Sequence, residues 1–218
     1  MSYCAYELDI DTTNLKEELR EYSNNQEYDE WGAFRSEGIS ETHYIDHNTV
    51  GKYTKKFYSL FKNGLLTNMR FLKTSHAHEI YPHIDQDLPQ RRPNNFNDEI
   101  PPHSIRTSTI NVLLNENESN DITNFYYDMD LIKYSRNTQD YYNRARDKNL
   151  KLMDSFQLKN KPLLINTGTW HSINYTTRRS LASFIFHPII SYNGCVEYCR
   201  ENKLLIERWH LGNVTLGQ

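Results

Sequence analysis

The chain has 218 residues, of which 24% are charged and 13% aromatic, with a net charge of −3 and a pI near 6.3. This length is enough for one substantial core, and single β domains commonly reach it. Lysines and arginines are scattered along the chain, so composition does not indicate a nucleic-acid-binding face. The N-terminus has no basic stretch followed by an apolar run, and no segment is long and apolar enough to span a bilayer. We therefore expect a cytoplasmic protein without a membrane partner.

The three cysteines, Cys4, Cys195 and Cys199, are odd in number and form no paired C-x-x-C arrangement. This spacing argues against a disulfide framework and against a structural zinc site. A reducing compartment fits best.

Two helices are predicted in the first third of the chain. Asn14 and Glu17 have the spacing of a capping box, which predicts a short helix through about Tyr22. A longer helix follows Asn48 and stops at Asn63-Gly64; its apolar residues at helical spacing are Val50, Tyr53, Phe57, Leu60 and Phe61. Aromatic residues at this spacing usually pack on a sheet, so we expect this helix to support the strands that follow.

From Asn68 onward the pattern changes to short strands. Their number is typical of a double-stranded β-helix, a cupin-like jelly roll that is mainly β with flanking helices. We expect a single domain over 1–218, with N-terminal helical support at 1–67, a jelly-roll core at 68–190 and a C-terminal extension at 191–218. The predicted strands are Asn68–Thr74, Glu79–Gln86, Ser108–Asn115, Thr123–Met129, Ser155–Leu158, Leu163–Asn166, Trp170–Tyr175 and Ser180–Phe186.

Two segments between the strands have no clear periodicity. The segment from Leu88 to Asn97 is rich in proline and asparagine, and it is either a lid over the site or a long solvent loop. The polar stretch from Tyr134 to Lys151 has no strong apolar face. We expect it to be a helical or irregular insertion near the opening.

His83 and Asp85 are the first candidates for chemistry. They flank Ile84 in an alternating segment, and residues at i and i+2 of a strand point to the same face, so both side chains can hold one ion. His171, on a later strand, supplies a third ligand. Two imidazoles and one carboxylate with open positions are the set that suits non-heme Fe(II).

A basic residue follows His171 closely. The strands Trp170–Tyr175 and Ser180–Phe186 are predicted to form a hairpin, whose paired residues share a face. With an even loop, Arg178 and Ser180 lie on the face of His171, where an arginine fork suits the far carboxylate of a dicarboxylate. An odd loop or a bulge places Arg179 there instead. We favour Arg178.

Further polar residues are weaker candidates. Thr109 and Asn111 share one strand face while Ile110 and Val112 share the other, so the polar pair can line the pocket, as can Tyr81. A purely structural hydrogen-bonding role is equally compatible with all three. The His76–Glu79 segment is similar to a cupin metal set but lacks its glycines and later histidine, so we do not favour it.

The pattern of these residues resembles that of the Fe(II)- and 2-oxoglutarate-dependent dioxygenases. Within that superfamily it is most similar to the aspartyl/asparaginyl β-hydroxylase and proline hydroxylase branch. The likeness covers about residues 70 to 190. It rests on His83-x-Asp85, on His171-Ser172-Ile173-Asn174, on Arg178-x-Ser180, and on the strands Thr109–Asn115 and Phe125-Tyr126. The chain departs from the branch in having Thr107 and Thr109 where an arginine and a histidine are frequent, and in a slightly short spacing from His171 to Arg178.

The resemblance implies an activity. His83, Asp85 and His171 would hold Fe(II), Arg178 and Ser180 would anchor 2-oxoglutarate, and O2 would be consumed to hydroxylate an aliphatic C–H bond, with succinate and CO2 as co-products. The branch favours a small-molecule or peptide substrate, namely a free or peptidyl amino acid. Two other classes stay open: a cupin-type isomerase or binding module, and a catalytically dead oxygenase that acts as an interaction protein.

Overall fold

The computed structural model describes most of the two sheets and the helices that pack on them. Its residues are 3–27, 29–30, 39–41, 45–46, 49–62, 64–74, 78–83, 107–115, 121–127, 150–175 and 179–207, with the backbone alone described at 29–30, 39–41, 78–83, 127 and 175. The segments Leu88–Asn97 and 134–149 lie outside these ranges, so the predicted lid and insertion are not described.

Within the described residues the strands form two antiparallel sheets. The seven-stranded sheet has the order β1-β9-β6-β11-β4-β3-β2, and the four-stranded sheet has the order β5-β10-β7-β8. From β4 to β11 the chain changes sheet at every step except between β7 and β8, which are paired neighbours in the small sheet. This is the strand order of a double-stranded β-helix and confirms the predicted fold class. The strands are β1 Ala5–Glu7, β2 Asp29–Glu30, β3 Ile39–Glu41, β4 Leu66–Thr74, β5 His78–His83, β6 Ser108–Leu113, β7 Ile122–Tyr127, β8 Lys151–Gln157, β9 Leu163–Asn166, β10 His171–Tyr175 and β11 Arg179–Phe186.

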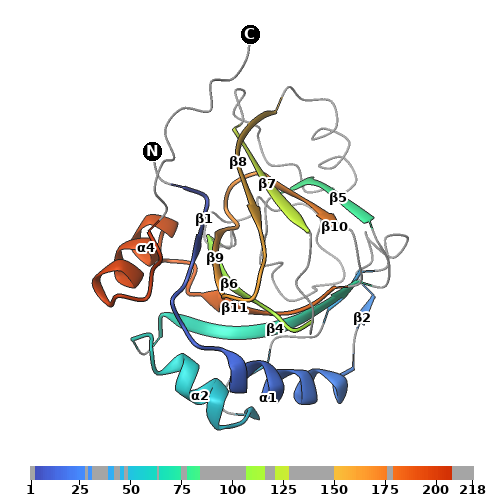
Figure 1. The fold of residues 1–218 in the computed structure, drawn as a ribbon, viewed down its shortest axis with the longest axis vertical. Coiled ribbons are helices and arrows are strands. Elements are labelled where there is room, and N and C mark those ends of the chain that lie inside the picture. Colours follow the sequence, from blue (N-terminus) through green and yellow to red (C-terminus); the bar gives the residue numbers. More distant parts are fainter. Residues whose placement is uncertain are drawn as a thin grey trace, which may run out of the picture.

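The two faces of the seven-stranded sheet pack against different partners. One buried cluster combines Leu113, Leu163 and Leu181 of this sheet with Phe125 of the four-stranded sheet, so it fills the space between the sheets. A larger cluster combines alternate residues of the same strands with helix residues. Figure 1 shows α1 and α2 beneath this outer face. Strand alternation therefore assigns each side chain of β6 and β11 either to the barrel interior or to the helix layer.

Three helices are described: α1 Thr13–Asn24, α2 Lys52–Tyr58 and α4 Tyr192–Glu201. Leu15 and Leu19 of α1 and Phe57 of α2 are buried in the outer cluster, as their helical spacing predicts. Helix α4 buries Cys195 and Cys199 against the same cluster. Its N-cap is Ser191, whose Oγ accepts a hydrogen bond from the Gly194 N–H at 3.1 Å.

The predicted helix starts are wrong in detail. Helix α1 begins one residue before Asn14, and its first N–H is bound by Asp11, whose Oδ1 accepts from Thr13 N at 3.0 Å. Helix α2 is shorter than predicted and begins after Gly51, while Asn48 lies outside the described residues. A residue from another helix, Glu18, binds the N-terminus of α2, and such a distant cap leaves no local signal in the sequence.

The N-terminal third contributes strands as well as helices. β1 pairs with β9, and β2 and β3 extend the far edge of the large sheet beyond β4, where only helices were expected. These strands are two or three residues long, too short to show a period of two.

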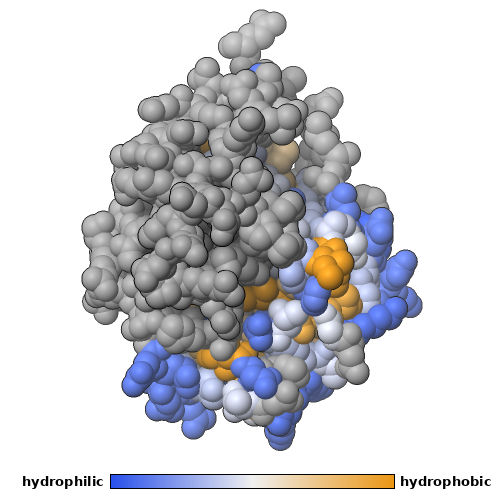
Figure 2. Space-filling view, turned by 180° about the vertical axis from the view of Figure 1, so that it is seen from behind, coloured by the Kyte–Doolittle hydropathy of each residue, from blue (hydrophilic) through white to orange (hydrophobic). Residues whose placement is uncertain are grey.

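Among the described helices none has the length and apolar character needed to cross a bilayer. Hydrophilic side chains dominate the described surface in Figure 2, with apolar ones in small patches between them. The large apolar side chains that are exposed include Ile122, Leu152 and Met153 on β7 and β8.

Candidate functional site

His171 lies at the start of β10, directly across from His83 in the register of β10 with β5. Directly paired residues of an antiparallel ladder are neighbours, and this is the placement that a pair of histidine ligands needs. A bulge follows at once, between His171 and Ile173. The side chain of His83, and Asp85 as a whole, lie outside the described part of the chain. Among the side chains that are described, no three metal-ligating groups gather in one place.

The His171 ring is buried and held in one tautomer. Its Nδ1 lies 2.8 Å from the carbonyl oxygen of Thr169, and the residue is 3% exposed. A carbonyl can only accept a hydrogen bond, so Nδ1 is the donor, and in the neutral imidazole Nε2 then carries the lone pair. Metal-binding histidines are commonly oriented in this way, by donating the other ring N–H to a carbonyl or carboxylate. His171 thus has the form that a divalent metal ion requires.

An apolar layer connects His171 with β11. The His171 and Phe125 rings lie 6.1 Å apart, measured between centroids, and the two residues pair across β10 and β7. Phe125 packs with Leu113 and Leu181 in the cluster between the sheets. His171 and the inward-facing residues of β11 therefore border the same interior space.

The predicted hairpin between the last two strands is wrong. β10 pairs with β5 and β7 in the small sheet, whereas β11 pairs with β4 and β6 in the large one. β10 and β11 therefore lie in different sheets, and loop parity cannot decide which arginine shares a face with His171. Arg178 lies outside the described residues.

Strand alternation assigns Arg179 and Ser180 to opposite faces of β11. Leu181 faces the interior and Ala182 the helix layer, and β11 runs without a register shift from Arg179 to Ile185. Arg179 therefore faces the interior, while Ser180 lies on the helix side and does not share the interior face expected for it. The Ser180 N–H donates to Oδ1 of Asn115 at 2.7 Å.

Arg179 is a buried cation at the end of the barrel interior. Its Nε lies 3.9 Å from Oδ2 of Asp121, and the two side chains are 2% and 1% exposed. Its backbone N–H donates to Thr74 Oγ1 at 2.9 Å. Asp121 immediately precedes β7, so the pair joins the two sheets. Sequence reasoning missed Asp121, because an acid before a strand is an ordinary turn residue unless its partner is known.

Thr109 and Asn111 face the barrel interior, as the alternation of β6 predicts. Ile110, Val112 and Leu114 are in the helix-side cluster. Thr109 is buried, and its Oγ1 donates to Asn111 Oδ1 at 3.4 Å. Asn111 pairs with Ser183 of β11, which lies four residues after Arg179 on that strand and therefore on the same face. For Tyr81 only the backbone, within β5, is described.

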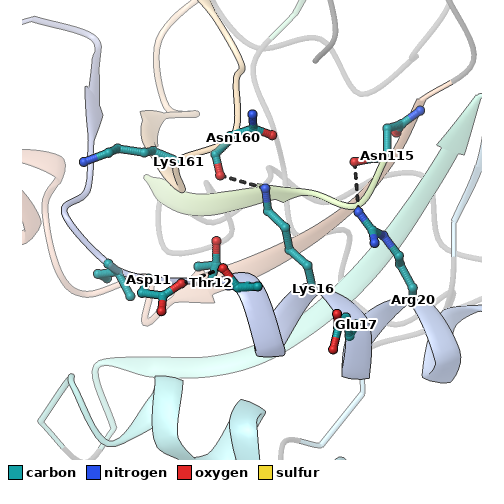
Figure 3. A pocket seen from close by; sticks show the side chains of 10 residues that line it. Asp11, Thr12, Lys16, Glu17, Arg20, Asn115, Asn160 and Lys161 are labelled. Carbon is teal, nitrogen blue, oxygen red and sulfur yellow. Dashed lines mark hydrogen bonds between the residues drawn. The ribbon is translucent and has the colours of Figure 1, made fainter. Parts of the chain in front are cut away.

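A separate pocket of about 380 Å³ lies on the outside of the barrel, between the start of α1 and the loops that follow β6 and β8. Figure 3 shows Lys16 and Arg20 reaching across it from α1. Lys16 Nζ donates to the carbonyl of Asn160 at 2.7 Å, and Arg20 donates to the carbonyls of Leu114 and Asn115. These cations bind the helix to the loops, so the pocket has the character of a structural junction.

Comparison with known proteins gives neither a matching family model nor a matching curated protein. Solved structures that resemble the chain include an oxidoreductase of the 2OG-Fe(II) oxygenase family from Burkholderia pseudomallei, with 7% identity, 84% of this chain and 82% of that chain covered, and a TM-score of 0.45. A prolyl-4-hydroxylase from Pseudomonas putida has 11% identity, 84% and 91% coverage, and a TM-score of 0.44.

HygX from Streptomyces hygroscopicus, solved with nickel, 2-oxoglutarate and hygromycin B, has 14% identity, 81% and 79% coverage, and a TM-score of 0.45. Likenesses at this level do not identify a relative. The fold assignment rests on the strand order and register of the chain itself.

Proposed function

We propose that this protein is an Fe(II)- and 2-oxoglutarate-dependent oxygenase in which His83, Asp85 and His171 hold the iron. The observation that carries the proposal is the pairing of His171 with His83 between β10 and β5, together with the 2.8 Å contact of His171 Nδ1 with the Thr169 carbonyl. Two imidazoles and a carboxylate are a donor set suited to non-heme Fe(II). In this tautomer His171 can bind the iron through Nε2.

Arg179, in place of Arg178, is the proposed anchor for the distal carboxylate of 2-oxoglutarate. It faces the interior space that His171 also borders, and a guanidinium can bind a carboxylate through two parallel hydrogen bonds. The apolar layer of Leu181, Leu113 and Phe125 lies beside it and would exclude water from the carbon chain of a bound keto acid. Thr109, Asn111 and Tyr81 are proposed to supply further polar contacts.

Bound iron, with O2 and 2-oxoglutarate, would supply the oxidation of a C–H bond and yield succinate and CO2. The protein would orient the keto acid through Arg179 and keep His171 in its metal-binding tautomer. We propose that the reaction is hydroxylation of an aliphatic carbon of a free or peptidyl amino acid. This finer assignment rests on the sequence resemblance.

The test is anaerobic titration of the purified protein with Fe(II) and then 2-oxoglutarate. Formation of the chelate gives a weak visible absorption band, and its absence in metal-loaded protein would reject the proposal in favour of a binding module. The variant His171→Ala should lose iron affinity by more than about a hundredfold, because even groups that only orient a ligand contribute 10–100-fold.

His187→Ala is a matched control, since that histidine follows β11 and its Nδ1 accepts from the N–H of Ile189 at 3.3 Å. It should bind iron as the unmodified protein does. Asp85→Ala should behave as His171→Ala. If either ligand variant kept full 2-oxoglutarate-dependent succinate release, the assignment of the iron ligands would be wrong.

A further inference from the structure

Asp121 and Arg179 form an ion pair that the proposed chemistry does not by itself require. The Arg179 Nε and Asp121 Oδ2 atoms are 3.9 Å apart, which is within ion-pair range and longer than a direct hydrogen bond between these two atoms. Both side chains are almost completely removed from solvent, at 2% and 1% exposure. The pair connects the first residue of β11 to the residue before β7.

The surroundings make the charge of Asp121 important to Arg179. The next inward-facing residue of β11 is Leu181, which belongs to an apolar cluster with Leu113 and Phe125. A cation in such a place is poorly solvated, and removing the partner of a buried charge is strongly destabilising. A carboxylate at 3.9 Å compensates the guanidinium charge without a ligand being present.

A dicarboxylate that reaches Arg179 would bring a second negative charge close to Asp121. A guanidinium has five N–H donors and can contact two carboxylates. Two carboxylates at one site nevertheless repel each other, and this repulsion is strong where water is excluded. The same acid that compensates the charge of Arg179 therefore opposes the binding of a second carboxylate to it.

We infer that Asp121 is a counter-ion of Arg179 and that it lowers the affinity of Arg179 for the distal carboxylate of the co-substrate. This inference rests on the proposed function, because it takes Arg179 as the anchor. Asp121 is a positioning residue that acts through Arg179. Its effect is specific to ligands that carry a distal carboxylate.

The test compares two keto acids on Mn(II)-loaded protein by titration calorimetry. 2-Oxoglutarate carries the distal carboxylate, and 2-oxopentanoate lacks it. Asp121→Asn keeps the shape of the side chain and removes its charge. We expect it to bind 2-oxoglutarate about tenfold or more tightly than the unmodified protein does, with little change for 2-oxopentanoate, because one like-charge repulsion is lost. The thermal midpoint without ligand should fall.

Asp154→Asn is the matched control. Asp154 lies on β8 of the same small sheet, and its Oδ2 accepts a hydrogen bond from the Cys4 N–H at 3.1 Å. Its loss should affect stability alone and leave the ratio of the two keto-acid affinities unchanged. Weaker or equal binding of 2-oxoglutarate by Asp121→Asn would overturn the inference.

Two further variants distinguish failure of the proposed anchor, Arg179, from failure of the inference about Asp121. Arg179→Gln should abolish the preference for 2-oxoglutarate over 2-oxopentanoate; if the preference persists, the proposed anchor is wrong whatever Asp121 does. Where Asp121→Asn alone folds poorly, the double variant Asp121→Asn/Arg179→Gln should recover stability, because both charges of the buried pair are then removed together. A double variant less stable than Asp121→Asn would contradict the counter-ion role.

Discussion

The Glu18 side chain connects α1 to α2, and its removal should destabilise the packing of the two helices. Its Oε1 accepts from the Thr54 N–H and the Thr54 hydroxyl, both at 2.7 Å, and its Oε2 accepts from the Tyr53 N–H at 3.0 Å. The first N–H groups of a helix have no partner within the helix, and the positive end of the helix dipole favours a carboxylate there. Glu18 therefore caps α2 from another element.

Glu18→Ala should lower the free energy of unfolding by about 2–3 kcal/mol. Loss of a helix cap costs about 0.5–2 kcal/mol, and hydrogen bonds to a charged group are worth about 1.5–3 kcal/mol each, although they do not add. In a protein of this size, this corresponds to a fall in Tm of about 4–12 °C. Glu17→Ala is the control, because Glu17 is the same residue type, adjacent and exposed.

Gly51 provides an independent test of the same contact. A Cβ at this position would clash with Glu18 Oε2, although the backbone φ of −73° suits any residue. Gly51→Ala should therefore displace the carboxylate and destabilise the protein by a comparable amount. In the double variant Gly51→Ala/Glu18→Ala the clash is gone, so the total loss should fall short of the sum by about 1 kcal/mol or more.

The measurement is urea denaturation followed by circular dichroism. Equal stability of Glu18→Ala and Glu17→Ala would refute the capping argument. Strict additivity in the double variant would show that Gly51 and Glu18 act independently.

Further predictions concern the two cores. Leu181→Ala should lower the free energy of unfolding by about 3 kcal/mol, because Leu181 is 4% exposed between the sheets. Leu152→Ala, at a residue that is 61% exposed, should change it by less than about 0.5 kcal/mol. Similar losses for the two variants in denaturation experiments would contradict the assigned interior. Burial raises the pKa of Cys195 from 9.0 to about 11 and that of Cys199 to about 12, so these thiols should resist alkylation in the folded protein at pH 8 and react once it is unfolded. The unfolded chain loses these protons near pH 9 and the folded protein keeps them, so the free energy of unfolding should fall as the pH rises from about 9 to about 11 or 12. A variant with both cysteines replaced by alanine should show a shallower fall, and an identical pH dependence would count against the assignment.

The sequence by itself determined where the barrel strands lie and which residues of each share a face. Predicted and observed bounds agree fully for Leu163–Asn166 and within a few residues for the other strands from β4 to β11 whose ends are described. The alternation of β6 correctly separated Asn111 from Ile110 and Val112. These features depend on side-chain periodicity, which is written locally in the chain. His83 and His171 were expected on two strands that are distant in the sequence but close in the fold, and they are paired between β5 and β10.

The tertiary structure alone decided which residues border one another across the barrel. Adjacent strands in sequence suggested a hairpin, yet β10 and β11 belong to different sheets, and the choice between Arg178 and Arg179 depends on that crossing. Asp121 meets Arg179, and Glu18 meets Thr54, only because separate elements are packed together. Strand pairing and distant capping are set by long-range burial, which leaves no periodic trace in the sequence. The sequence therefore indicates the proposed metal ligands more clearly than the proposed anion anchor.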